Sequence, residues 1–168
     1  MSFIELLKNR ADMLPNDSIQ ADIYVFTLQG KKYVLKLYKK YENHGGDILA
    51  GLSHDNIVKL YDHGYHRGHQ YLIMDFVEGE PLSYITDDIE KQLRDLLAYL
   101  QSKGVEHHEF KPAHLILNAE SRVKLIDFGI ATSPEYELNT TLSSETNKKY
   151  GTIDVKAVEA IIAELRAQ

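Results

Sequence analysis

Two acidic residues, Glu109 and Asp127, stand out within residues 105–129, which read VEHHEFKPAHLILNAESRVKLIDFG. They lie 127 − 109 = 18 positions apart. Glu109 is expected in a loop, because the nearby Pro112 lacks an N–H group and forces extended geometry on the residue before it. Asp127 ends an apolar run and is followed by an aromatic residue and then Gly129. A loop carboxylate and a strand-end carboxylate suit phosphoryl transfer, one facing the substrate hydroxyl and the other a magnesium ion.

The elements that position these carboxylates can be predicted from apolar spacing. Residues 115–117 and 123–126 are short apolar runs separated by polar residues, which predicts a β-hairpin. Upstream, Thr86 or Asp87 could cap a helix that ends at Gly104. Its apolar residues recur at helical spacing and are expected in the core: Ile89, Leu93, Leu96, Leu97 and Leu100.

This stretch resembles the catalytic loop and metal-binding motif of eukaryotic-type protein kinases, His-Arg-Asp-Leu-Lys-Pro-x-Asn followed by Asp-Phe-Gly. Two positions depart from the family pattern. Glu109 stands where the family has its catalytic aspartate, and His114 stands where it has its metal-binding asparagine. The residues that match are His107, Lys111, Pro112, Asp127, Phe128 and Gly129.

The resemblance extends to the nucleotide-binding half. Lys36 follows two apolar residues, as does the family's phosphate-binding lysine. Ser18 stands at a place where the family's phosphate loop has glycine, although an ordinary hairpin explains this segment equally well. The glutamate that pairs with the lysine has no aligned counterpart, because Gly45 occupies its place. Either Glu42 supplies the ion pair from a shortened helix, or the pair is missing.

Residues 74–79 resemble the hinge between kinase lobes. Met74 then lies at the gatekeeper position, and the backbone of Asp75 and Val77 is expected to bind adenine. The implied division is an N-lobe over residues 1–77 and a C-lobe over residues 78–168.

Past the second motif, residues 132–152 are polar, which predicts a loop with several possible phosphorylation sites. The final helix is expected from Asp154 to Leu165, and the resemblance implies that the Asp154 carboxylate bonds the backbone of the catalytic loop.

The remaining expectations concern three segments. Residues 2–13 are expected to form a helix, followed by strands that turn at Gly30. Residues 57–61 and 70–76 are expected to form antiparallel strands around a turn at Gly64 and Gly68. This turn carries His63, His66 and His69, for which an exposed loop is a plainer explanation than a metal site.

Composition limits the class of protein. The 168 residues include no cysteine, which excludes disulfides and cysteine-bearing zinc sites. The net charge of −6 argues against general nucleic-acid binding, which uses a basic face. No basic residue precedes the first apolar run, and no run approaches the ~20 residues of a membrane helix. A cytoplasmic location without a signal peptide is therefore expected.

The resemblance implies an α+β, protein-kinase-like fold of two lobes over about residues 14–165, with an antiparallel N-lobe sheet, a short helix and a curtailed helical C-lobe. RIO kinases are similarly small. The implied function is an ATP-dependent serine/threonine kinase, capable at least of autophosphorylation, that binds Mg²⁺ or Mn²⁺ and acts on a protein of unknown identity. Lys36 positions phosphates, and Asp127 and His114 bind metal. Glu109 orients the hydroxyl, and Lys111 steadies the transferred group.

Three alternatives accompany this interpretation. A pseudokinase would be a kinase-shaped module that binds nucleotide or protein without transfer, and the departures at Glu109 and His114 favour it. A small-molecule substrate is also compatible with the residues present. A metal hydrolase is disfavoured, because the zinc-protease helix needs two histidines four positions apart, and Pro112 breaks any helix here.

Overall fold

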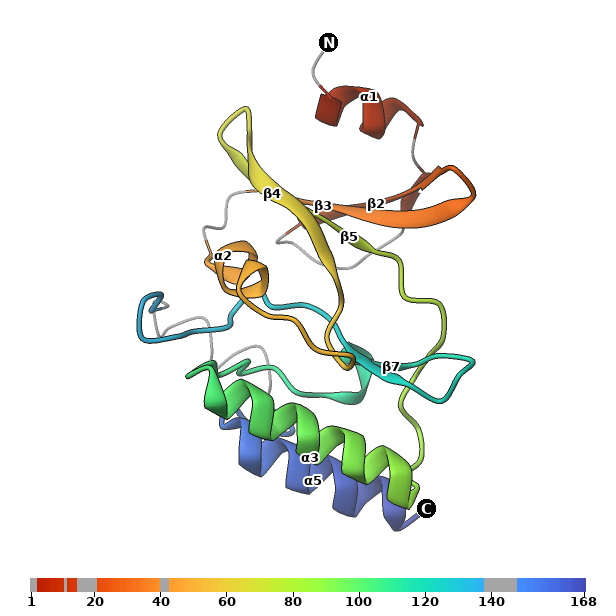
Figure 1. Cartoon of the computed structure of the whole chain (residues 1–168), viewed down its shortest axis with the longest axis vertical. Helices are drawn as coiled ribbons and strands as arrows, with labels where there is room; N and C mark the ends of the chain where they lie inside the picture. Colours follow the sequence, from red (N-terminus) through yellow and green to blue (C-terminus); the bar gives the residue numbers. More distant parts are fainter. Residues whose placement is uncertain (1–2, 11, 15–20, 40–42, 138–147) are drawn as a thin grey trace. The chain divides into compact units, whose positions relative to one another are not determined.

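A computed structural model describes residues 3–10, 12–14, 21–39, 43–137 and 148–168. The chain divides into two compact units. Unit 1 comprises Met1–Glu42 and Lys59–Phe76, and unit 2 comprises Asn43–Val58 and Val77–Gln168. The expected antiparallel sheet lies in unit 1, and the two long helices lie in unit 2 (Figure 1).

The described residues of unit 1 form an antiparallel sheet and one helix. Its strands run in the order β1-β2-β3-β5-β4. The bounds are α1 Phe3–Arg10, β1 Asp12–Leu14, β2 Ala21–Leu28, β3 Lys31–Tyr38, β4 Leu60–His66 and β5 His69–Asp75. The β2–β3 turn uses Gln29 and Gly30, both with positive φ, so glycine is suited to its place there.

Helix α1 is attached to the sheet of unit 1 by apolar packing. Ile4 and Leu7 are buried in one cluster with Phe26 of β2, Leu35 of β3 and Ile73 of β5. These strand residues face the same way because side chains of an antiparallel sheet alternate between its faces.

Two expectations for unit 1 were wrong in detail. The first helix ends at Arg10, and residues 12–14 pair with β2 instead of continuing the helix. The strand expected at residues 57–61 begins at Leu60, and Gly64 lies within it, because the turn is made by Arg67 and Gly68. Ile57 instead forms a parallel bridge to Leu125 in unit 2.

The three histidines flank the β4–β5 turn. His66 and His69 face each other across the hairpin, whereas His63 is opposite Leu72. Among the described residues, no group of three His, Asp or Glu side chains could hold a metal ion.

In its described residues, unit 2 combines three helices with a small antiparallel sheet in the order β6-β7-β8. A 3₁₀ turn, η1, precedes β7. The bounds are α2 Gly45–Ala50, β6 Glu80–Pro81, α3 Asp87–Ser102, η1 Pro112–His114, β7 Leu115–Leu117, β8 Val123–Leu125 and α5 Asp154–Arg166.

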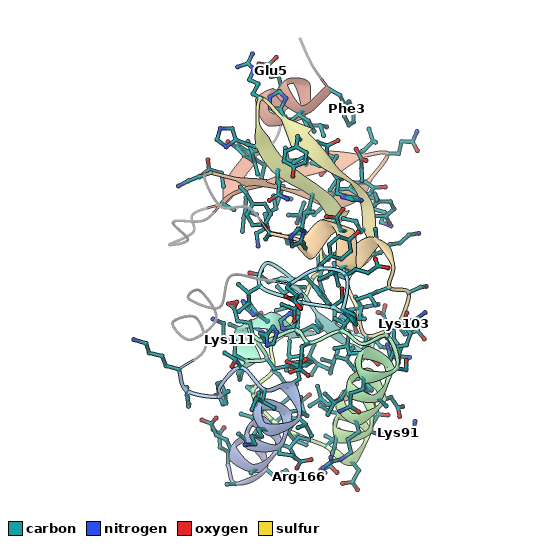
Figure 2. The ribbon with its side chains drawn as sticks, turned by 90° about the vertical axis from the view of Figure 1, so that its left-hand side faces the viewer. Phe3, Glu5, Lys91, Lys103, Lys111 and Arg166 are labelled. Atoms are coloured by element: carbon teal, nitrogen blue, oxygen red, sulfur yellow. The ribbon has the colours of Figure 1, made fainter. Side chains whose placement is uncertain are left out.

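Helices α3 and α5 lie side by side and antiparallel (Figure 1). The Thr86 side chain accepts a hydrogen bond from the Ile89 N–H and caps α3 as expected. The leucines predicted for the core of α3 are buried. Arg166, labelled in Figure 2, joins the end of α5 to Asp87 at the start of α3, with Nη2 2.9 Å from the carboxylate. Within the described residues, no helix has the length and apolar character needed to cross a membrane.

Candidate active site

Four predicted site residues converge in unit 2. The Lys111 Nζ lies 3.3 Å from Glu109 Oε1. The His114 Nε2 lies 3.8 Å from the same oxygen and 3.6 Å from Asp127 Oδ2. The catalytic loop and the strand-end motif therefore meet around one imidazole, with a cationic lysine on the Glu109 side (Figure 2 labels Lys111).

The turn η1 sets this geometry. Pro112 occupies its first position, where the missing N–H costs nothing, and Lys111 before it is extended with φ −158°. The Ile126 N–H donates to the His114 carbonyl at 2.9 Å, which fixes η1 to the residue before Asp127. Asp127 itself has φ +62°, a region sparsely populated by residues with a side chain. Such strain is typical of a functional position.

The orientation of the His114 ring is fixed from one side. Its Nδ1 lies 2.9 Å from the Glu109 carbonyl oxygen, which can only accept a hydrogen bond, so Nδ1 carries the hydrogen. In the neutral ring, Nε2 therefore directs a lone pair towards the two carboxylates. A nitrogen ligand such as His114 Nε2 suits Mn²⁺, whereas Mg²⁺ favours oxygen alone.

The two carboxylates differ in their surroundings. The Asp127 side chain is 31% exposed and its Oδ1 accepts from the Gly129 N–H at 3.2 Å. The Glu109 side chain is 12% exposed, and burial raises the pKa of its carboxyl. Asp127 raises this pKa further, whereas His114 and Lys111 lower it. Burial therefore makes the Glu109 carboxylate more basic than a free glutamate, which suits a proton acceptor.

Two buried groups support the catalytic loop. His107 is fully buried: its Nδ1 accepts from the Glu109 N–H at 3.1 Å, and its Nε2 lies 3.2 Å from the Ile126 carbonyl. Burial lowers the His107 pKa to about 3, so the ring is neutral. The Asp154 carboxylate accepts from the N–H groups of His107 and His108 at 2.7 and 2.8 Å, as the resemblance implies. Burial raises the Asp154 pKa to about 6 although these bonds oppose it.

The start of α2 is in close contact with the second motif. A Cβ added at Gly45 would lie 2.6 Å from the Phe128 carbonyl oxygen. The family's paired glutamate therefore cannot be accommodated at this position without moving the backbone. The helix is six residues long, and its two glycines, Gly45 and Gly46, disfavour a longer one.

Unit 2 also contains a buried amide network that the sequence did not predict. Gln92 Oε1 accepts from Asn56 Nδ2 and from the Val123 N–H, both at 2.9 Å. Its Nε2 donates to Asp88 Oδ2 and to the Ser121 carbonyl, both at 2.8 Å. A glutamine within the apolar stripe of α3 was the available signal, because a buried polar side chain requires partners.

Three of the residues predicted to bind nucleotide lie in the sheet of unit 1. Lys36 is buried on β3, with Nζ 5.1 Å from the centre of the Tyr38 ring. Met74 is buried on β5. The Asp75 N–H donates to the Lys59 carbonyl at 3.0 Å, so an adenine contact from Asp75 has to use its carbonyl oxygen.

Three further positions complete the predicted nucleotide set. Val77 is the first residue of unit 2 after the chain leaves unit 1. Ser18 and Glu42 lie outside the described residues. Their predicted roles at the phosphates and at Lys36 remain predictions.

Comparison with known proteins identifies the family. The model of the protein kinase domain matches residues 21–165, which include β2, the converging site and most of α5. The chain belongs to the protein kinase family. This membership agrees with the antiparallel sheet and with the helical unit that carries the two motifs.

Curated members of the protein kinase family are similar over parts of their length. The probable serine/threonine-protein kinase PknB of Lactococcus lactis is 32% identical over 116 residues, 62% of this chain and 18% of that protein. Serine/threonine-protein kinase PrkC of Bacillus subtilis is 30% identical over 115 residues, 62% of this chain and 17% of that protein. AtPK1/AtPK6 of Arabidopsis thaliana is 26% identical over 153 residues, 84% of this chain and 32% of that protein. The chain thus spans less than a third of each relative.

Proposed function

We propose that this protein kinase family member is an ATP-dependent phosphotransferase of the serine/threonine type, capable at least of autophosphorylation. The observation that carries the proposal is the convergence of Glu109, Lys111 and Asp127 around His114 within one unit. A module that only binds other proteins has no chemical need for a buried carboxylate beside a lysine and a second, more exposed carboxylate.

Each residue of the proposed site has a role that follows from its surroundings. Glu109 accepts or orients the proton of the substrate hydroxyl, since burial raises the pKa of its carboxyl. Lys111 Nζ, 3.3 Å from Glu109, holds that carboxylate in place and presents positive charge to the transferred group. Asp127 is exposed enough to reach a bound cation. When bound, Mg-ATP or Mn-ATP supplies the phosphoryl group and neutralises its charge.

His114 gives the proposed site its metal preference. Its Nε2 faces Asp127 Oδ2, where the family has an amide oxygen, and nitrogen ligands favour Mn²⁺ over Mg²⁺. We expect transfer to be faster with Mn²⁺. His114→Asn restores an oxygen ligand, so in this variant the ratio of the Mn²⁺ rate to the Mg²⁺ rate should fall. An unchanged ratio would remove His114 from the metal site.

The second candidate function is a pseudokinase that binds nucleotide without transferring phosphate. The close contact of Gly45 with the Phe128 carbonyl favours it, because α2 has no space at that position for the glutamate of active family members. Glutamate in place of aspartate favours it too, since Glu109 carries one more methylene and transfer is sensitive to displacements of about 1 Å.

One assay separates the two candidates. The protein is incubated with labelled ATP and Mg²⁺ or Mn²⁺ as wild type, as Asp127→Ala and as Asp95→Ala. The last variant removes an exposed carboxylate of α3 in the same unit and serves as the matched control. Incorporation that persists in Asp95→Ala and falls by about 100-fold or more in Asp127→Ala supports the kinase. Equal incorporation in both variants refutes the assignment of Asp127, and nucleotide binding without incorporation supports the pseudokinase.

A further inference from the structure

The side chain of Asp75, the last residue of β5, is held by residues of the two neighbouring strands. Tyr61 of β4 donates its hydroxyl hydrogen to Asp75 Oδ1 at 2.6 Å. The Nζ of Lys31, the first residue of β3, lies 2.7 Å from the Tyr61 hydroxyl oxygen and 3.1 Å from Asp75 Oδ1. The hydroxyl therefore accepts from a cation and donates to a carboxylate, and two such bonds strengthen each other by polarisation.

Ring packing fixes the position of the Tyr61 hydroxyl. The Tyr61 and Tyr33 rings meet edge to face with centroids 5.2 Å apart, and Tyr33 stacks on Phe26 at 5.4 Å. The Lys31 Nζ lies 5.5 Å from the Tyr33 centroid and 5.2 Å from the Tyr61 centroid. Because an aromatic face attracts a cation, the two rings hold the Lys31 ammonium group in addition to Asp75.

The Tyr61 hydroxyl and the Lys31 ammonium group both keep their hydrogens at neutral pH. Hydrogen bonds to Tyr61 and Asp75 raise the pKa of Lys31. Burial, followed by the hydrogen bond to Asp75, raises the pKa of Tyr61. Both groups therefore remain donors over the whole pH range of a binding experiment.

The peptide that follows Asp75 is only loosely fixed by backbone bonds. The Asp75 N–H donates to the Lys59 carbonyl at 3.0 Å, and the Phe76 N–H donates to the Lys32 carbonyl at 3.3 Å. The second bond is longer than the usual N–H···O distance of about 2.9–3.0 Å, and β5 ends at Asp75. The anchored Asp75 side chain therefore supplies a second constraint on the orientation of the Asp75 carbonyl.

We propose that Lys31 and Tyr61 are positioning residues that hold the Asp75 carbonyl in place for the 6-amino group of adenine. They act through the Asp75 side chain and touch no nucleotide themselves. A fixed carbonyl can only accept a hydrogen bond, so it favours a purine with an amine at position 6. The inference rests on the proposed function, because it requires ATP to bind.

Purine riboside 5′-triphosphate, which lacks only the 6-amino group of ATP, is the probe for this contact. The dissociation constants of ATP and of this analogue are measured by calorimetry with Mg²⁺ on the whole chain. The wild type should bind ATP about 5-fold more tightly than the analogue, as expected for one hydrogen bond. Tyr61→Phe and Lys31→Met should lose most of this preference, whereas Lys31→Arg keeps the cation and should retain it.

Tyr65→Phe is the matched control. It removes an exposed hydroxyl from the same strand as Tyr61 and should leave the preference for ATP unchanged. A loss of stability without a positioning role would weaken the binding of both nucleotides equally and leave their ratio unchanged.

Amide hydrogen exchange measures the same constraint in the absence of nucleotide. Exchange of the Phe76 N–H should be about 5-fold faster in Tyr61→Phe and Lys31→Met than in the wild type. It should stay at the wild-type rate in Lys31→Arg and Tyr65→Phe. Exchange at Leu35, which is buried on β3, should be the same in all of these proteins.

The outcomes separate the positioning role from the proposed function. A wild type without a preference for ATP, an unchanged preference in Tyr61→Phe, or unchanged exchange at Phe76 would overturn the positioning role, whether or not phosphate is transferred. ATP binding without transfer would overturn the kinase assignment alone, because the preference for ATP still reports on the Asp75 carbonyl. A wild type that binds neither nucleotide would overturn both.

Discussion

Replacing Gly45 by alanine tests whether the start of α2 is set against the second motif. The added Cβ would lie 2.6 Å from the Phe128 carbonyl oxygen and 3.0 Å from both the Phe128 carbonyl carbon and Asn43 Oδ1. Ordinary van der Waals contact begins near 3.4 Å, so the backbone has to move by about 3.4 − 2.6 = 0.8 Å. Backbone atoms cannot rotate away as a side-chain tip can.

The effect of Gly45→Ala on the free energy of unfolding can be estimated from two opposing contributions. Overpacking a well-packed site costs about 1–3 kcal/mol, whereas alanine is favoured over glycine in a helix by about 1 kcal/mol. We therefore expect Gly45→Ala to lower the free energy of unfolding by about 1–2 kcal/mol, measured by chemical denaturation. Because Phe128 follows Asp127 directly, displacing its carbonyl should also reduce phosphotransfer by on the order of 10-fold to 100-fold.

Gly51→Ala is the matched control. Gly51 follows the same helix, its φ is −89°, and its added Cβ would meet only the Ile48 carbonyl at an ordinary 3.5 Å. This variant should be as stable as the wild type, or more stable by up to about 1 kcal/mol. If Gly45→Ala matches Gly51→Ala in both stability and activity, the close contact between α2 and Phe128 is not what sets the geometry of the motif.

Three further predictions concern stability. Gln92→Leu leaves the buried Val123 N–H without its acceptor and should cost about 2–4 kcal/mol in denaturant titrations. The His107 pKa of about 3 lies below the 6.5 of the unfolded chain. The contribution of the neutral ring to the free energy of unfolding is therefore complete above pH 6.5 and is lost as pH falls towards 3. At pH 5 this loss should reach about 2 kcal/mol and should be absent in His107→Asn. Arg166→Ala should leave the melting temperature close to that of the wild type, because the ion pairs of Arg166 are exposed.

Each of these predictions has its own control. Gln101→Leu changes an exposed glutamine on the same helix and should alter stability by less than about 0.5 kcal/mol. Asp154, whose pKa is raised to about 6, has the opposite pH dependence. Its contribution to the free energy of unfolding is lost as pH rises through 6. The pH experiment therefore compares the slopes of wild type and His107→Asn, and identical slopes would contradict a neutral buried ring. A large cost for Arg166→Ala would mean that its ion pairs are better shielded from water than their exposure indicates.

The sequence was sufficient for features that depend on local chemistry and short spacing. The capped helix from Asp87 with its leucine core, the hairpin before Asp127 and the final helix from Asp154 all follow from apolar periodicity and turn residues. The motif spacing also brought Glu109, Lys111, His114 and Asp127 into one predicted site, and the structure places them together. Helix and strand boundaries near residues 10–14 and 57–64 were less predictable, because pairing with neighbouring strands determines them.

Only the tertiary structure decided which distant groups meet. Nothing in the spacing of Lys31, Tyr61 and Asp75 indicates that one hydroxyl joins them, since such bonds depend on how the strands pair. Likewise, the sequence showed that Gly45 replaces a glutamate, but not that the Phe128 carbonyl fills the space where its Cβ would be. Sequence spacing determines which faces of helices and strands are apolar, whereas long-range hydrogen bonds and close backbone contacts exist only once those faces have packed.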